Sequence, residues 1–130
     1  MNVIKKLTET VNFLKQKSKN KPRIGVILGS GLGHFVQHMQ VEATIPFHDI
    51  PNFIPPTVEG HSGNLIFGKI ENVNLVVLQG RLHYYEGHSM ETVVFPARVM
   101  ALLGIEILVV TNSAGGYGDG MNAGDFMIIQ

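Results

Sequence analysis

The sequence predicts an α/β fold in which a mixed or parallel twisted sheet is flanked by helices. Three short apolar runs are typical of buried strands, and each opens directly into a loop rich in glycine or in charged and aromatic residues. Two helices are expected as well, one before the first of these runs and one before the last. Because ligands of open α/β sheets bind outside the carboxyl ends of the strands, function is expected at these loops.

The first helix is expected over residues 2–17, as an amphipathic helix with a lysine-rich outer face. Its apolar residues recur at helical spacing and are Val3, Leu7, Val11 and Leu14. The second helix is expected over Met90–Leu103 and should end at Gly104. Pro96 restricts the first part of that segment, so a start near Val93 is the expected alternative.

The three apolar runs predict strands at Ile24–Leu28, Leu75–Leu78 and Ile105–Val110, which should be neighbours in one sheet. Leu65–Phe67 is a further apolar run, and Glu71–Asn74 between it and the second strand reads as a hairpin turn. Antiparallel pairing is therefore expected at that point, and the carboxyl ends of the three principal strands should converge.

Composition excludes several classes of protein. The chain has 130 residues, about one domain, and 45% of them are hydrophobic, which suffices for a core. Ten basic and ten acidic residues give no net charge, so nucleic acids and anionic membranes are not expected partners. Without cysteine there is no disulfide scaffold, thiolate zinc site or cysteine nucleophile. No apolar run approaches the roughly 18 residues of a membrane span, and no secretory signal is recognisable, so a cytoplasmic location is expected.

The most informative segment is Gly80–Gly87, which follows the strand expected at 75–78 and carries arginine, histidine, tyrosine and glutamate within six positions. Arg81 is typical of an oxyanion site, because its planar fork matches phosphate or carboxylate. His83 can add a second donor whose charge depends on pH. An ordinary salt bridge is the alternative for Arg81, but its clustering with His83 and Glu86 favours a functional site.

Two glycine-rich loops are expected to join this segment. Gly29–Gly33 follows the first strand and Thr111–Gly116 follows the third, and each offers backbone N–H groups and a hydroxyl, the composition of a phosphate-binding nest. Glycines that merely permit a tight turn are the alternative for the first loop. The loop is not a dinucleotide fingerprint, because His34 stands where that motif needs glycine. The three strand ends together predict one combined anion site.

A metal site is not expected. Six histidines are present, and His34 and His38 would face one way on a helix. No acidic residue or third histidine stands near this pair, so it is interpreted as a solvated helix face.

The order and character of five motifs resemble those of a known family. The motifs are Gly29–Gly33, Glu59–Gly63, Gly80–Gly87, Phe95–Arg98 and Thr111–Gly116. From Ile24 to its last residue the chain closely resembles the N-terminal part of the trimeric class of purine nucleoside phosphorylases. Methylthioadenosine phosphorylases share the glycine loop and the general fold, but they look unlike this chain around Tyr84–Gly87.

The resemblance implies a phosphorylase/hydrolase-like fold and the activity of a pentosyltransferase. Phosphorolysis of purine (deoxy)ribonucleosides would give free purine and (deoxy)ribose 1-phosphate, a reaction of nucleoside metabolism and purine salvage. Inorganic phosphate would be the co-substrate, with no metal or organic cofactor. A homo-oligomer, the trimer of the family, is also implied.

The resemblance also implies roles for individual residues at the phosphate. The phosphate-binding residues would be Ser30, His61, Arg81, His83 and Ser113. His83 and Glu86 would be the catalytic residues, with Glu86 orienting His83 or taking part in the phosphate network.

Further residues would surround the nucleoside. Tyr85 would pack on the ribose, and a wall between phosphate and base would be formed by Asn112, Ser113, Ala114 and Gly115. The family usually has alanine where Ser113 stands, a change that adds a hydroxyl and leaves the backbone donor in place.

The end of the chain predicts an incomplete domain. Asp125–Gln130 reads as a strand that enters the core, and domains seldom end inside a buried strand. We therefore expect residues 1–130 to form a single N-terminal portion of a nucleoside phosphorylase domain, incomplete at its C-terminus. Because the family's base-recognising acid and amide lie beyond Gln130, the alternatives are a catalytically incomplete fragment that binds phosphate or sugar phosphate, and a structural fragment that pairs with a separate second half.

Overall fold

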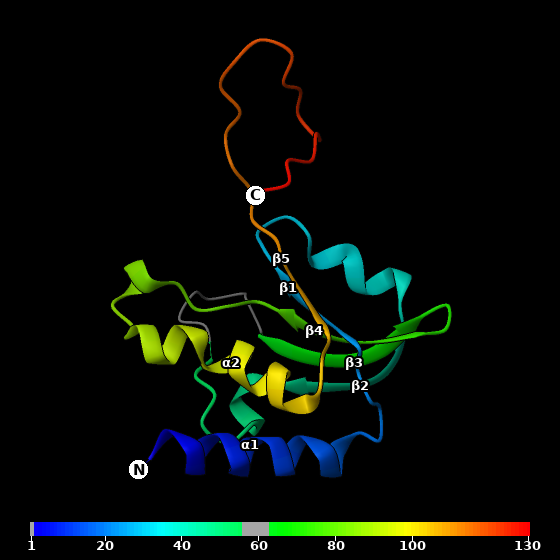
Figure 1. The fold of residues 1–130 in the computed structure, drawn as a ribbon, viewed down its shortest axis with the longest axis vertical. Helices are drawn as coiled ribbons and strands as arrows, with labels where there is room; N and C mark the ends of the chain where they lie inside the picture. Colours follow the sequence, from blue (N-terminus) through cyan, green and yellow to red (C-terminus); the bar gives the residue numbers. More distant parts are fainter. Residues whose placement is uncertain (1, 56–62) are drawn as a thin grey trace.

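The computed structural model describes residues 2–55 and 63–130, and its centre is one sheet of five strands. In chain order the strands are β1 (Ile24–Leu28), β2 (Gln40–Pro46), β3 (Asn64–Ile70), β4 (Val73–Gln79) and β5 (Ile107–Val110). Their spatial order is β2-β3-β4-β1-β5 (Figure 1). Two α-helices, α1 (Val3–Lys17) and α2 (Met90–Leu103), pack against one another beside this sheet.

The core lies on both faces of the sheet, because side chains alternate between the faces along each strand. On one face α1 and α2 cover the buried side chains Leu65, Phe67, Val76 and Leu78. On the other face the short helix η1 (Gly33–His38) and Met39 cover Val26, Leu28, Ile66, Leu75 and Val77. Burial on both faces explains why β3 and β4 read as continuous apolar runs.

The three principal strands are neighbours, as predicted. β1 is central and runs parallel to β4 on one side and to β5 on the other. The last strand begins at Ile107 and not at Ile105, because the N–H groups of Glu106 and Ile107 both donate to the carbonyl of Arg23 before regular pairing begins. The carboxyl ends of β4, β1 and β5 therefore lie at one edge of the sheet.

The predicted hairpin is also confirmed. β3 pairs antiparallel with β4 through a two-residue turn in which Glu71 has the positive φ of 51°. β2 pairs antiparallel with β3 at the edge of the sheet. β2 was not predicted, because most of its side chains are exposed and show no apolar alternation. The sheet is thus mixed, with a parallel half and an antiparallel half.

Both predicted helices are present. Asn2 caps α1 by accepting the N–H of Ile4 at 3.0 Å, and α2 ends at Gly104, whose φ is 99°. The alternative start of α2 near Val93 is wrong. Ser89 caps the helix by accepting the N–H of Thr92. Pro96 cannot donate a backbone hydrogen bond within the helix, and burial of the face that carries Phe95 offsets this loss.

The strand predicted at Asp125–Gln130 is wrong for this structure. Residues 111–130 contain no helix or strand and extend beyond the sheet as a loop (Figure 1). Phe126 is 92% exposed and Ile128 is 88% exposed. A strand needs a neighbour for its backbone groups, and in the described residues no segment pairs with this one.

Within the described part of the chain, no helix is both long and apolar enough to cross a membrane.

Candidate anion-binding site

The loops after the three parallel strands converge at one edge of the sheet. Arg81 follows β4, and its Nη1 donates a hydrogen bond of 2.8 Å to the carbonyl oxygen of Thr111, the first residue after β5. The Arg81 side chain is half-buried. One N–H group of the guanidinium is therefore bonded to the neighbouring loop. Because the guanidinium is planar, this bond also restricts the orientation of its other N–H donors.

The glycine-rich loop after β1 meets the same residue. The hydroxyl of Thr111 accepts the N–H of Gly29 at 2.9 Å and donates to the carbonyl of Ile27 at 3.1 Å. A Cβ at position 29 would lie 2.6 Å from the Thr111 carbonyl oxygen and 2.8 Å from the Asn112 Cα. Only glycine fits here, so this glycine serves close approach between two strand ends and not merely a turn.

The turn of the glycine loop leaves donors available. Gly31 has a φ of 86°, and the only backbone bond within the turn joins the N–H of Leu32 to the carbonyl of Gly29. Among residues 2–55 and 63–130, nothing accepts the N–H groups of Ser30 and Gly31. At the far end of the loop, Nε2 of Gln79 donates to the carbonyl of Gly33 at 3.1 Å. The loop is thus held at both ends by side chains from the strands on either side.

His83 is oriented by its own short helix, η3 (Tyr84–Glu86). The Glu86 carboxylate accepts the backbone N–H of His83 at 2.6 Å, and the His83 side chain accepts the N–H of Glu86, which together form a reciprocal cap. The His83 ring stacks on Tyr85 with 4.7 Å between centroids and 14° between planes. The Glu86 carboxylate thus holds the backbone of His83 in place, and the Tyr85 side chain remains 83% exposed.

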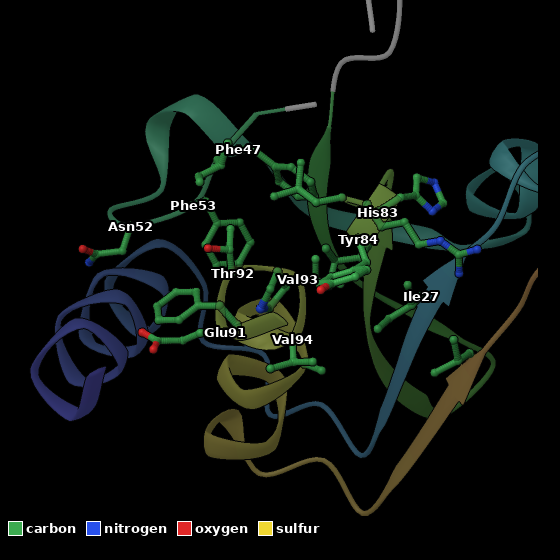
Figure 2. A pocket seen from close by; sticks show the side chains of 18 of the residues that line it. Ile27, Phe47, Asn52, Phe53, His83, Tyr84, Glu91, Thr92, Val93 and Val94 are labelled. Carbon is green, nitrogen blue, oxygen red and sulfur yellow. The ribbon is translucent and has the colours of Figure 1, made fainter. Parts of the chain in front are cut away.

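A cavity of about 400 Å³ opens beside Arg81 and His83. Figure 2 shows His83 and Tyr84 toward one end of it and Phe53 and Thr92 toward the other, with α2 forming part of the wall. The three strand ends were predicted to form one combined anion site with Ser30, Arg81 and Asn112 around it, but not all three residues line this cavity. Their loops touch one another, but within the described part of the chain this cavity is lined by Arg81 and not by Ser30 or Asn112.

The remaining predicted residues lie after β5 or outside the description. Asn112, Ser113, Ala114 and Gly115 are all exposed, and the Asn112 amide donates to the Ser113 carbonyl at 3.3 Å. They stand directly after Thr111, at the same edge of the sheet as Arg81. His61 lies outside the described residues.

The histidine pair in η1 differs from its prediction. The segment is a 3-10 helix, in which residues three apart are aligned, so His34 and His38 do not share one face. Nδ1 of His34 is instead 3.1 Å from Nε2 of Gln37. Among the described residues there is no group of three or more histidine, aspartate or glutamate side chains that could hold a metal.

Sequence reasoning missed Thr111 and Gln79 as residues that shape the site. Thr111 was assigned only to the loop after the last strand, and Gln79 fell between the predicted strand at 75–78 and the segment at 80–87. Each contacts a segment distant in sequence, at a sequence separation of 82 for Gly29 and Thr111 and of 46 for Gly33 and Gln79. Their signal in the sequence is a polar side chain at the last strand position or the first loop position. That signal has meaning only once parallel pairing to β1 is known.

A salt bridge lies at the opposite, amino-terminal end of β1 and β5. The guanidinium of Arg23, just before β1, makes two hydrogen bonds of 3.0 and 2.7 Å to the carboxylate of Glu106, just before β5. These hydrogen bonds, followed by the attraction of the charges, lower the pKa of Glu106 and raise the pKa of Arg23. The pair is exposed and joins the amino ends of β1 and β5.

Comparisons with known proteins agree with this architecture. Residues 23–130 match the model of the phosphorylase superfamily. Purine nucleoside phosphorylase 1 of Geobacillus stearothermophilus is 50% identical over 124 residues, which is 95% of this chain and 45% of that protein. Purine nucleoside phosphorylase of Mus musculus is 45% identical over 121 residues, which is 93% of this chain and 42% of that protein.

Solved structures give the same result. A crystal structure of purine nucleoside phosphorylase in complex with ribose-1-phosphate superimposes with a TM-score of 0.87 at 45% identity, covering 96% of this chain and 46% of that one. The chain therefore spans a little under half the length of the relatives it matches. With a mixed sheet, converging loops and a superfamily match that begins one residue before β1 and runs to the end of the chain, the protein belongs to the phosphorylase superfamily.

Proposed function

We propose that this chain provides the phosphate-binding part of a purine nucleoside phosphorylase. The observation that carries the proposal is the convergence of Arg81, the Gly29–Gly33 loop and the loop after β5 at one sheet edge, with Arg81 bonded to Thr111 at 2.8 Å. A guanidinium beside unpaired backbone N–H groups is a combination that recognises a tetrahedral oxyanion. The relatives named above support phosphate and a purine nucleoside as the substrates.

The proposed reaction is a transfer of the pentosyl group to phosphate. A phosphate oxygen forms a bond to C1′ of the (deoxy)ribose as the bond from C1′ to the purine breaks, and the electron pair of that bond leaves with the purine. Positive charge develops on the sugar in the transition state, so a fixed anionic phosphate both attacks and stabilises. Ser30, Arg81 and the backbone at Ser113 would fix the phosphate, and His83, whose backbone is held by Glu86, would add a further hydrogen-bond donor.

The nucleoside would lie on the exposed side of this phosphate. Tyr85 would meet the ribose, and residues 112–115 would separate phosphate from base. His61 is part of the proposed phosphate set as well. Inorganic phosphate is the co-substrate in this proposal, without a metal or organic cofactor, and the protein would act in the cytoplasm as a homo-oligomer, with a trimer as the proposed state.

A second candidate is a fragment that binds phosphate or sugar phosphate without turning it over. The chain spans 42–46% of the length of the relatives named above. The wall residues 112–115 are also exposed in the described structure, with nothing placed against them to hold a purine. Phosphate binding is common to both candidates, whereas turnover separates them.

Calorimetric titration with phosphate tests the shared part. Arg81→Ala should weaken binding by about 1.5–3 kcal/mol, the contribution of a hydrogen bond to a charged group, and Arg81→Lys should recover only part of the loss because an ammonium cannot reproduce the fork. Arg98→Ala is the matched control. Arg98 is exposed on α2, and this substitution removes the same charge as Arg81→Ala. Equal affinity in Arg81→Ala and the unchanged chain would refute the site.

Release of hypoxanthine from inosine separates the two candidates. A coupled assay would be run with the 130-residue chain alone and with a polypeptide that supplies the rest of a relative's sequence. We expect little or no turnover by the chain alone, because lost acid–base help commonly costs about 10²–10⁴ in rate and lost substrate orientation costs more. Robust turnover by the chain alone would exclude the fragment.

A further inference from the structure

We infer that Thr111 and Gln79 are positioning residues that hold the Gly29–Gly33 loop in its anion-binding shape. The inference rests on the proposed phosphate site, and it assigns a role to two side chains that need not touch phosphate. Thr111 acts at the start of the loop, where its hydroxyl accepts the N–H of Gly29. Gln79 acts at the end of the loop, where its amide donates to the carbonyl of Gly33.

Thr111 joins all three converging segments. Its hydroxyl contacts Gly29 and Ile27 on the β1 side at 2.9 and 3.1 Å, and its carbonyl receives the Arg81 guanidinium from the β4 side at 2.8 Å. Its backbone N–H also donates to the carbonyl of Ile27 at 3.0 Å. One half-buried residue therefore sets the distance between the arginine and the glycine loop.

The hydroxyl has a specific chemical task. The N–H of Gly29 is half-buried at the point where the strand ends, and the Thr111 oxygen is its partner. The next N–H groups, those of Ser30 and Gly31, are unpaired in the described structure and available to an oxyanion. Without the hydroxyl the Gly29 donor needs another partner, and the loop must shift to find one.

Gln79 completes the arrangement from the opposite strand. It is the last residue of β4, and its Oε1 accepts the side-chain amide of Asn64 at 3.2 Å while its Nε2 holds Gly33. The contact with Asn64 orients the Gln79 amide so that its nitrogen faces the loop. Both neighbours of β1 thus contribute one polar side chain to the same loop.

The test compares isosteric variants by phosphate titration. Thr111→Val removes the hydroxyl and keeps the shape, Thr111→Ser keeps the hydroxyl, and Gln79→Met keeps the length without the amide. We expect about 2- to 10-fold weaker phosphate binding for Thr111→Val and for Gln79→Met, the equivalent of one lost hydrogen bond each, and near-complete rescue in Thr111→Ser. Amide hydrogen exchange at Gly29 should accelerate in Thr111→Val and not in Thr111→Ser.

A control separates positioning from general loss of stability. Thr10, on α1, is also a threonine whose hydroxyl contacts backbone distant from the site, because its oxygen lies 2.9 Å from the carbonyl oxygen of Lys6 and 2.7 Å from that of Pro51. Thr10→Val should lower the unfolding temperature and leave phosphate affinity unchanged. All titrations are done where circular dichroism shows each variant folded.

The outcomes distinguish this inference from the proposed function. Unchanged phosphate affinity in both Thr111→Val and Gln79→Met, with normal binding by the unchanged chain, would overturn the positioning role alone. Absence of phosphate binding by the unchanged chain would overturn the proposed site, and the positioning role with it. Equal losses of phosphate affinity in Thr10→Val and Thr111→Val would also overturn the positioning role, because the loss would then follow from lower stability.

Discussion

A single methyl group at position 29 should separate the loops that form the site. In Gly29→Ala the new Cβ would lie 2.6 Å from the Thr111 carbonyl oxygen and 2.8 Å from the Asn112 Cα. Both are backbone atoms and cannot rotate away, so β5 or the loop after it must move. Overpacking of this kind typically costs about 1–3 kcal/mol.

The displaced atom gives this substitution a second effect. The Thr111 carbonyl that the methyl group would push is the acceptor of the Arg81 guanidinium. We therefore expect Gly29→Ala to lower both the free energy of unfolding and the affinity for phosphate. Urea denaturation followed by circular dichroism measures the first, and calorimetric titration at a temperature where the variant is folded measures the second.

Gly33→Ala is the matched control within the same loop. Its Cβ would have only the Gln79 Nε2 within 4 Å, at 3.9 Å, which is an ordinary contact. Its free energy of unfolding should be unchanged or slightly higher, because alanine restricts the unfolded chain. If Gly29→Ala and Gly33→Ala unfold with free energies within about 0.5 kcal/mol of each other, the close approach of the strand ends is wrong.

Three further outcomes are expected. Leu65→Ala, at a fully buried position, should cost about 2–5 kcal/mol of unfolding free energy, whereas Leu102→Ala, at a position 53% exposed, should change it by at most about 0.5 kcal/mol; similar urea midpoints for the two would contradict the assigned core. Ser89→Ala should cost about 0.5–2 kcal/mol by removing the cap of α2, and an unaltered unfolding curve would count against a helix that begins at Met90. The Glu106 pKa is lowered in the folded state, so its stabilising contribution is present above the ordinary carboxyl pKa and is lost as pH falls through the lowered value. The melting temperatures of the unchanged chain and Glu106→Gln should therefore converge in acid, and a gap that widens there would refute the pairing.

The parallel half of the sheet could be predicted because burial leaves a clear pattern. β4 places Val76 and Leu78 in the core on one face and Leu75 and Val77 on the other, so its sequence is an uninterrupted apolar run. α1 could be predicted for the related reason that only one face of it is buried, which selects a helical spacing of apolar residues.

The antiparallel edge and the last residues could not be predicted in this way. β2 lies at the sheet edge and buries only Ile45 among its seven residues, so tertiary pairing determines its conformation and composition does not. Phe126–Ile129 has the composition of a strand, yet these residues are exposed and unpaired in the described structure. Strand propensity is satisfied only where a neighbour supplies the hydrogen bonds.

In the candidate site, too, some residues could be predicted from the sequence and others could not. Arg81 and Ser30 belong to motifs whose residue types and positions after a strand predict anion binding. Thr111 and Gln79 were missed because their function lies in contacts between distant segments. Which hydroxyl satisfies which backbone N–H depends on register, and the register that pairs Ile27 with Val110 is a property of the assembled sheet.

The geometry of the site depends on the least buried strand of the sheet. All four residues of β5 are exposed, from Leu108 at 41% to Val110 at 58%, and β5 pairs only with β1 among the described strands. Its position is secured at both ends, by Arg23 and Glu106 where it begins and by the Thr111 hydroxyl where it stops. Because the Thr111 carbonyl anchors Arg81, separation of β5 from β1 would release the guanidinium and the Gly29 N–H together. Local opening of this strand and loss of the anion site should therefore be one event, in which phosphate binding slows amide exchange along β5 as well as in the loops that it contacts.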